Sequence, residues 1–187
     1  MKIALIAFDQ FTDLDLFLPW DLLNRVRIEC GVADWEVSIL GTAASHVSMS
    51  GLRIPVTGNI EEAADADAVV FGSGKGVIPL LADRDYLARY SLSPDRQLIT
   101  AMCSGSLLLA ALGLLQGKKA TTYPTRRTAL AGYGVEVVDK DFVTDGRIAT
   151  AAGCLAAVAL SRWLIAALHS EELASRVLQT VQPVGQV

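Results

Sequence analysis

Short runs of aliphatic and β-branched residues alternate along this chain with longer segments of helical spacing. The runs that predict strands are residues 3–8, 35–40, 68–71, 98–102 and 120–122, and several are apolar at every position. Continuous apolar runs of this length suit parallel strands that are covered on both faces. The alternation therefore predicts an α/β fold, a doubly wound and mostly parallel sheet flanked by helices as in flavodoxin-like three-layer sandwiches.

The segments between the strands predict helices at 19–26, 78–90, 104–115, 125–131, 153–169 and 171–180. Pro19 suits the first turn of its helix. Segments 47–56 and 136–149 predict hairpins that turn at Ser50-Gly51 and Asp145-Gly146. No linker or repeat divides the chain, so we expect one domain over residues 1–187. Ligands of such a fold bind beyond the carboxyl ends of the strands.

Composition excludes several classes of partner. The chain has 16 Lys and Arg against 20 Asp and Glu, a net charge of −4, so it has no general attraction for nucleic acid or anionic membranes. No uninterrupted apolar stretch reaches the ~18 residues that span a bilayer, and the first apolar run is too short for a secretory signal. Three cysteines without a CxxC pair fit a reducing cytosol. We therefore expect a cytoplasmic protein. No His/Cys/Asp cluster has the sequence spacing of metal ligands, so we expect no metal, and we also expect no cofactor.

Cys103 stands where the apolar run 98–102 ends and a helical pattern begins with Ser-Gly-Ser. This order of strand, nucleophile and helix is that of a nucleophile elbow. The N-terminus of the helix favours thiolate over thiol. The competing interpretation is a small buried apolar residue at a strand end. Cys30 and Cys154 do not follow a strand into a Gly/Ser turn, and we expect both to be packing residues.

Asp15 is the candidate acid. Three carboxylates, Asp13, Asp15 and Asp21, follow the first predicted strand, and Asp15 alone has apolar neighbours on both sides, Leu14 and Leu16. A carboxyl group in such surroundings is either paired or kept neutral, and both conditions are typical of active sites. A satisfied helix cap is the alternative. We expect Asp13 to cap a helix or to be solvated, and Asp21 to face water.

A glycine-rich turn at residues 72–76, Gly-Ser-Gly-Lys-Gly, follows the run 68–71. It lacks the spacing of a phosphate-binding loop and the full dinucleotide fingerprint. Exposed backbone N–H groups on such a turn can instead form part of an oxyanion hole. By itself the turn does not decide between these uses.

These pieces, in this order and with a Thr-Thr-Tyr-Pro sequence at 121–124 downstream, resemble the ThiJ/PfpI superfamily, whose fold is like that of class I glutamine amidotransferases. The resemblance extends from residue 2 to about residue 181. It implies that Cys103 is the elbow cysteine, that Asp15 is the acid hydrogen-bonded to it, and that the backbone N–H groups of Gly74 and Ser104 are oxyanion donors. It places Tyr123 at the pocket, where a structural role is the alternative, and it implies a homodimer.

Departures from the family pattern narrow the expected chemistry. Ser104 stands where protease-like members have histidine, and Tyr123 where glyoxalase and deglycase members have histidine. His46 and His169 match no catalytic position of the family. The remaining acid–thiol pair resembles the isonitrile hydratase-like branch, which implies that Cys103 attacks a small electrophile and yields an N-substituted formamide. The alternatives are a redox-sensing or stress-response protein with an oxidisable Cys103, and a glyoxalase, deglycase or amidase-type hydrolase.

Overall fold

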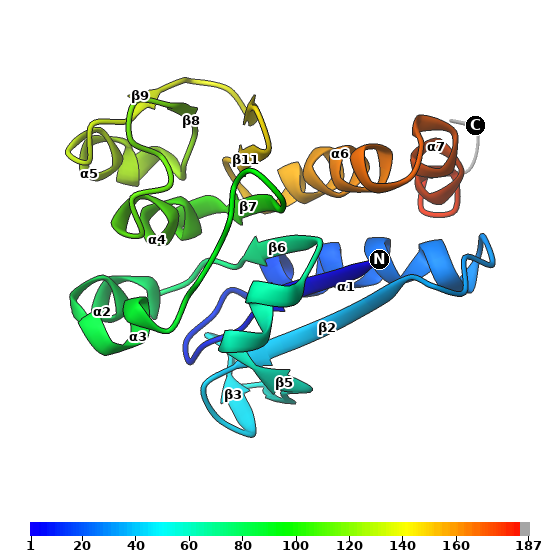
Figure 1. Ribbon diagram of the computed structural model, residues 1–187, viewed down its shortest axis with the longest axis horizontal. Coiled ribbons are helices and arrows are strands. Elements are labelled where there is room, and N and C mark those ends of the chain that lie inside the picture. Colours follow the sequence, from blue (N-terminus) through cyan, green and yellow to red (C-terminus); the bar gives the residue numbers. More distant parts are fainter. Residues whose placement is uncertain (184–187) are drawn as a thin grey trace.

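A seven-stranded sheet forms the centre of the computed structural model, which describes residues 1–183 (Figure 1). The strand order is β10-β11-β7-β6-β1-β2-β5, and every neighbouring pair is parallel except β10 and β11. The strands are β1 (Lys2–Ile6), β2 (Glu36–Gly41), β5 (Gly58–Asn59), β6 (Ala68–Phe71), β7 (Leu98–Met102), β10 (Phe142–Asp145) and β11 (Ile148–Ala151). Strands β6, β7 and β11 are buried along their whole length, which explains their continuous apolar sequence. The predicted doubly wound α/β fold is confirmed.

Helices cover the two faces of this sheet. They are α1 (Asp13–Ile28), α2 (Val77–Ala82), α3 (Arg84–Ala88), α4 (Ser106–Ala111), α5 (Arg127–Ala131), α6 (Ala157–Leu168) and α7 (Glu171–Gln179). Four 3₁₀ turns complete the order: η1 (Ile60–Asp65), η2 (Cys103–Gly105), η3 (Pro124–Arg126) and η4 (Cys154–Ala156). From β1 the chain moves toward one edge of the sheet, and from β6 toward the other. Right-handed crossovers therefore place α1 and α2 on opposite faces. Helices α1, α6 and α7 pack together, as do α2 and α4 (Figure 1).

The first helix begins earlier than predicted. It starts at Asp13, so Pro19 lies inside it and not in its first turn. Proline has no N–H to donate, and the carbonyl group of Asp15, four residues earlier, therefore loses its usual helical partner. The predicted helix 78–90 is divided at Asp83, which leaves the helical conformation and caps α3 by accepting a hydrogen bond from the Tyr86 N–H at 2.9 Å. The predicted helix 104–115 ends early, at Ala111.

Two short sheets lie outside the central one. The hairpin predicted at 47–56 is confirmed as β3 (Ser45–Val47) and β4 (Arg53–Pro55). The run 120–122 does not join the central sheet: β8 (Lys119–Ala120) pairs in parallel with β9 (Glu136–Val137). In the predicted hairpin 136–149, only β10 and β11 pair, with the turn at the expected Asp145-Gly146. Strand β11 also pairs with β7. Its carboxyl end therefore lies beside that of β7.

Within residues 1–183, no helix is both long enough and apolar enough to cross a lipid bilayer.

Candidate active site

Cys103 occupies a sharp turn between β7 and α4. Its φ of +49° lies in the left-handed region, which residues with a side chain seldom adopt. A methyl group at Gly105 would lie 2.3 Å from the carbonyl oxygen of Gly72, so only glycine allows the turn to approach the loop after β6 this closely. The hydroxyl groups of Ser106 and Thr122 each donate to the carbonyl oxygen of Cys103 at 3.0 Å. These contacts give Cys103 the geometry of the predicted elbow.

Asp15 lies in the first turn of α1 and is fully buried, with 0% of its surface exposed. The Ser73 hydroxyl donates to its Oδ2 and also lies 3.0 Å from the Thr12 hydroxyl. Its Oδ1 is buried and has no hydrogen-bond partner within residues 1–183. One carboxylate oxygen of Asp15 and the sulfurs of Cys103 and Cys154 all lie within 4.8 Å of one another. We call these three residues the acid–thiol cluster.

Asp13 and Asp21 are outside this cluster. Asp13 accepts a hydrogen bond from the Ser50 hydroxyl at 2.8 Å. Asp21 pairs with Arg25, one helical turn away, at 2.7 Å, and its side chain is 54% exposed. The expectation that Asp21 faces water is confirmed, and the single acid of segment 11–21 that reaches the thiols is the one with apolar neighbours.

Both thiols of the acid–thiol cluster have raised pKa values. Burial and the negative charge of Asp15 raise the pKa of the Cys103 thiol to about 12. Burial, and then the interactions with Asp15, raise the pKa of the Cys154 thiol to about 11. These raised pKa values favour the thiol form of both cysteines. The expectation that the helix N-terminus favours a Cys103 thiolate, with the shared proton held by Asp15, stays a prediction.

Cys154 was expected to be a packing residue, and this interpretation is wrong. It begins η4, directly after Gly153, whose φ is +99°. It is half-buried and lines the same cavity as Cys103. The expectation of no metal was based on sequence spacing, and this proximity in space is not visible there: ligand atoms of metal-binding type meet here from distant parts of the chain. Cys30, by contrast, packs against the core as expected.

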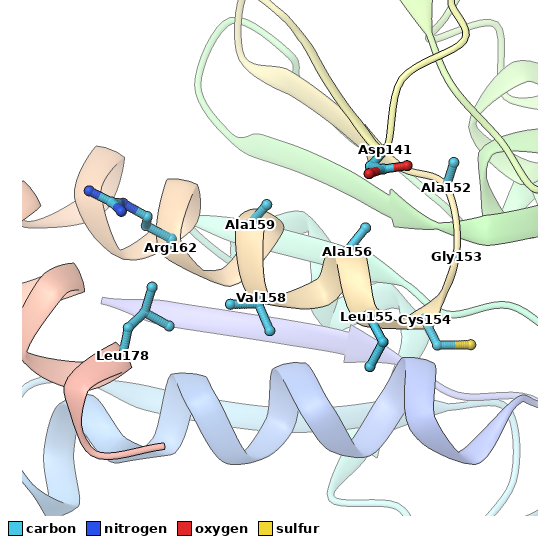
Figure 2. Close-up of a pocket in the computed structure, with 10 residues that line it drawn as sticks. All are labelled: Asp141, Ala152, Gly153, Cys154, Leu155, Ala156, Val158, Ala159, Arg162 and Leu178. Atoms are coloured by element: carbon cyan, nitrogen blue, oxygen red, sulfur yellow. The ribbon is translucent and has the colours of Figure 1, made fainter. Parts of the chain in front are cut away.

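A cavity of about 340 Å³ opens over Cys103, and we call it the reactive cavity. Its lining includes Thr12, Met49, Ser73, Gly74, Lys75, Ser104, Tyr123, Thr125 and Arg126, together with both thiols of the acid–thiol cluster. A second cavity of about 690 Å³ runs along the beginning of α6, and Cys154 lines both cavities (Figure 2). The two cysteines of the cluster therefore border a cavity that small molecules can enter, whereas Asp15 is buried behind them.

The two residues predicted to supply the oxyanion donors, Gly74 and Ser104, both line the reactive cavity. The Gly74 N–H donates to the Ser104 hydroxyl at a long 3.4 Å. A methyl group at Gly74 would lie 2.1 Å from the carbonyl oxygen of Gln10, so this backbone position also requires glycine. The oxyanion role of Gly74 and Ser104 stays a prediction, but both lie beside the elbow.

Tyr123 lines the reactive cavity and is 47% exposed. This position agrees with the pocket position that the resemblance implies, and the role of Tyr123 there stays a prediction. The structural contacts of this segment come from the two threonines before it. The Thr121 N–H donates to the Thr150 hydroxyl at 2.8 Å, and the Thr122 hydroxyl holds the elbow carbonyl as described above.

Neither histidine belongs to the described lining of the reactive cavity. His46 is buried in β3, where its Nε2 accepts from the Thr42 N–H at 3.2 Å and its Nδ1 lies 3.3 Å from an Asp9 carboxylate oxygen. His169 is exposed at the C-terminal end of α6. Both histidines therefore lie away from the described lining, and the acid–thiol cluster is the candidate for acid–base chemistry here.

A doubly wound sheet with a cysteine elbow at the end of a central strand is characteristic of proteins with the class I glutamine amidotransferase-like fold. Residues 1–167 match the DJ-1/PfpI family, and the chain belongs to this family. It is 32% identical over 160 residues to an isonitrile hydratase of Pseudomonas putida, covering 84% of this chain and 68% of that protein. It is 27% identical over 148 residues to a deglycase of Pyrococcus horikoshii, covering 78% of this chain and 86% of the deglycase.

Comparison of structures gives the same result. A ThiJ/PfpI family protein from Pseudomonas syringae superimposes with a TM-score of 0.84 and 27% sequence identity. The match covers 100% of this chain and 77% of that one. A Drosophila melanogaster DJ-1beta structure, at 22% identity and a TM-score of 0.82, shares the fold.

Proposed function

We propose that this protein is a cysteine-nucleophile enzyme that hydrates isonitriles to N-substituted formamides. The observation that carries the proposal is a buried Asp15 carboxylate oxygen within 4.8 Å of the Cys103 sulfur, which lines the reactive cavity, with no histidine in the described lining. The relationship to an isonitrile hydratase, at 32% identity, supports the same chemistry. An isonitrile needs a nucleophile and a proton at one carbon atom, and an acid–thiol pair supplies both.

The first step uses the proton that Asp15 and Cys103 share. Transfer of the thiol proton to the Asp15 carboxylate leaves a Cys103 thiolate, which attacks the terminal carbon of the isonitrile and forms a C–S bond. The electron pair that this leaves on the carbon takes the proton from Asp15. The product is a thioimidate bound to Cys103, and Asp15 is again a carboxylate.

The second step releases the product. Asp15 accepts one proton of a water molecule as the water oxygen adds to the thioimidate carbon, and passes that proton to the nitrogen. The C–S bond then breaks, the departing sulfur takes the proton of the new hydroxyl group, and an N-substituted formamide leaves. In this proposal the backbone N–H groups of Gly74 and Ser104, two residues of the cavity lining, stabilise negative charge that develops during both steps. The ring of Tyr123 gives the substrate an aromatic surface and a hydroxyl donor at the cavity wall.

Cyclohexyl isocyanide is a direct test of this proposal. Purified protein should convert it to the formamide, and Cys103→Ala should abolish turnover. Cys30→Ala is the matched control, because it removes a thiol outside the reactive cavity. Absence of turnover in the wild type, or turnover that survives Cys103→Ala, would refute the proposal.

A parallel assay with methylglyoxal separates this function from the glyoxalase and deglycase alternative. Tyr123 stands where such members have histidine, so we expect consumption of methylglyoxal to be much slower than isonitrile hydration. The reverse order of rates would favour the alternative.

A further inference from the structure

Cys154 has no role in the hydration proposed above, yet its sulfur belongs to the acid–thiol cluster. We propose that Cys154 is the resolving partner of Cys103, so that mild oxidation by a peroxide joins the two residues in a reversible intramolecular disulfide. This bond would block the Cys103 nucleophile without destroying it. The inference does not depend on which electrophile Cys103 attacks.

The fold brings the two cysteines together from positions that are about fifty residues apart in the sequence. Strands β7 and β11 are parallel neighbours, with Met102 opposite Ala151 at their carboxyl ends. Cys103 follows the first strand directly. After the second, the chain turns at Gly153, with its positive φ, and presents Cys154 at the beginning of η4. Figure 2 shows the Cys154 sulfur pointing away from the side chains of Leu155 and Val158.

The remaining gap between the sulfurs is small. They lie within 4.8 Å of each other, and a disulfide bond is about 2.05 Å long. Closure therefore needs a combined movement of less than about 3 Å, which two side chains can share by rotation about χ1. Cys154 is only half-buried, so its side chain has room to turn. Cys30 does not line the reactive cavity and cannot compete for this bond.

The reactive cavity gives a peroxide access to both sulfurs. The Cys103 thiolate, formed when Asp15 takes its proton, attacks one peroxide oxygen. The S–O bond forms, the O–O bond breaks, and the departing hydroxide takes the proton from Asp15 to give water. Cys154 then transfers its own proton to Asp15 and attacks the Cys103 sulfur. The S–S bond forms, the S–O bond breaks, and a second water leaves with that proton. Two thiols and one peroxide thus give one disulfide and two waters.

The proposal also predicts how far Cys103 is oxidised when Cys154 is missing. A cysteine sulfenic acid with no thiol nearby is oxidised further to sulfinic acid, which ordinary thiol reductants do not reverse. A neighbouring Cys154 would intercept the sulfenic acid at the reversible stage. Loss of Cys154 should therefore convert a recoverable inactivation of Cys103 into a permanent one.

Thiol counting and peptide mapping test the proposal. The reduced protein has three free thiols, and one equivalent of hydrogen peroxide should leave one, with the loss of two hydrogen atoms in the intact mass. Trypsin places the three cysteines in separate peptides, 28–53, 97–118 and 148–162, so the cross-link is identified directly. The expected link joins 97–118 to 148–162. Dithiothreitol should restore all three thiols and the alkylation of Cys103 by iodoacetamide.

Two variants complete the design. Cys30→Ser should form the same link, because its thiol lies elsewhere. Cys154→Ser should form none. With two equivalents of hydrogen peroxide it should gain two oxygen atoms on Cys103 and should not regain alkylation with dithiothreitol; Cys154→Ala repeats this test with a different side chain. The proposal is overturned if wild-type Cys103 gains oxygen while Cys154 stays free, or if the link includes Cys30. It is also overturned if Cys154→Ser recovers as fully as the wild type. None of these measurements requires isonitrile turnover. A failure of the disulfide proposal can therefore be distinguished from a failure of the proposed hydratase function.

Discussion

Asp15→Asn should separate the reactivity of Cys103 from its catalysis. Burial and the charge of Asp15, in that order, raise the pKa of the Cys103 thiol from 9.0 to about 12. Asp15 is the second cause of this rise, after burial. Removing its charge should lower the pKa and increase the thiolate fraction at pH 8 by about tenfold, the change that one pKa unit brings. The variant should nevertheless lose isonitrile hydration, because an amide cannot supply the proton for the substrate carbon.

The rate of alkylation by iodoacetamide, measured at Cys103 by peptide mass between pH 7 and 11, checks this prediction. Alkylation follows the thiolate, so the rise in rate should move to lower pH in the variant. Asp13→Asn is the matched control, because Asp13 lies two residues away and contacts Ser50 instead of the thiols. Slower or unchanged alkylation in Asp15→Asn would refute the electrostatic argument, and undiminished hydration would refute the role of Asp15 as the acid.

Other positions give independent predictions. Gly105→Ala places a methyl group against the carbonyl oxygen of Gly72 and should cost about 1–3 kcal/mol in the free energy of unfolding, whereas Gly72→Ala, whose nearest contact is an ordinary 3.5 Å, should cost less in the same urea titration. Lys75 and Arg126 line the reactive cavity, so replacing either by alanine should reduce the ratio of iodoacetate to iodoacetamide labelling of Cys103 about two- to five-fold, and an unchanged ratio would contradict this. Burial raises the pKa of Tyr86 to about 12, so the folded state keeps a proton that the unfolded state loses near pH 10; stability should fall as pH rises from about 10 to 12, and Tyr86→Phe should weaken this dependence. The family resemblance predicts a homodimer, which light scattering would report as a mass near twice 19.9 kDa, and a monomer at every concentration would contradict it.

The central strands could be predicted because they are buried on both faces. Segments 68–71 and 98–102 were predicted with their observed bounds, since a strand covered on both sides must be apolar throughout. The start of α1 was missed because Pro19 was given the role of a first-turn residue. Two acidic residues in the true first turn, Asp13 and Asp15, are the sequence signal that marks the earlier start.

The residues of the candidate site could be predicted where their neighbours in the sequence mark them. Cys103 follows an apolar strand, and Asp15 stands among apolar neighbours. Cys154 has the same signal, because the run Ile148–Ala151 precedes an Ala-Gly-Cys turn and a helix. It was missed because the segment before it was interpreted only as a hairpin. The raised thiol pKa values depend on proximity in space, which no local pattern carries.

The carbonyl oxygen of Cys103 accepts hydroxyl hydrogen bonds from two unrelated parts of the chain, Ser106 in α4 and Thr122 in the loop after β8. Because two hydroxyl groups bind this carbonyl oxygen, the peptide group of Cys103 is held from two sides and cannot rotate independently of them. The orientation of the Cys103 side chain therefore depends partly on the loop that carries Tyr123 into the cavity. In the proposed enzyme, a substitution that reshapes that loop to admit a different substrate would also move the Cys103 sulfur, so changes in selectivity and in reactivity would be coupled.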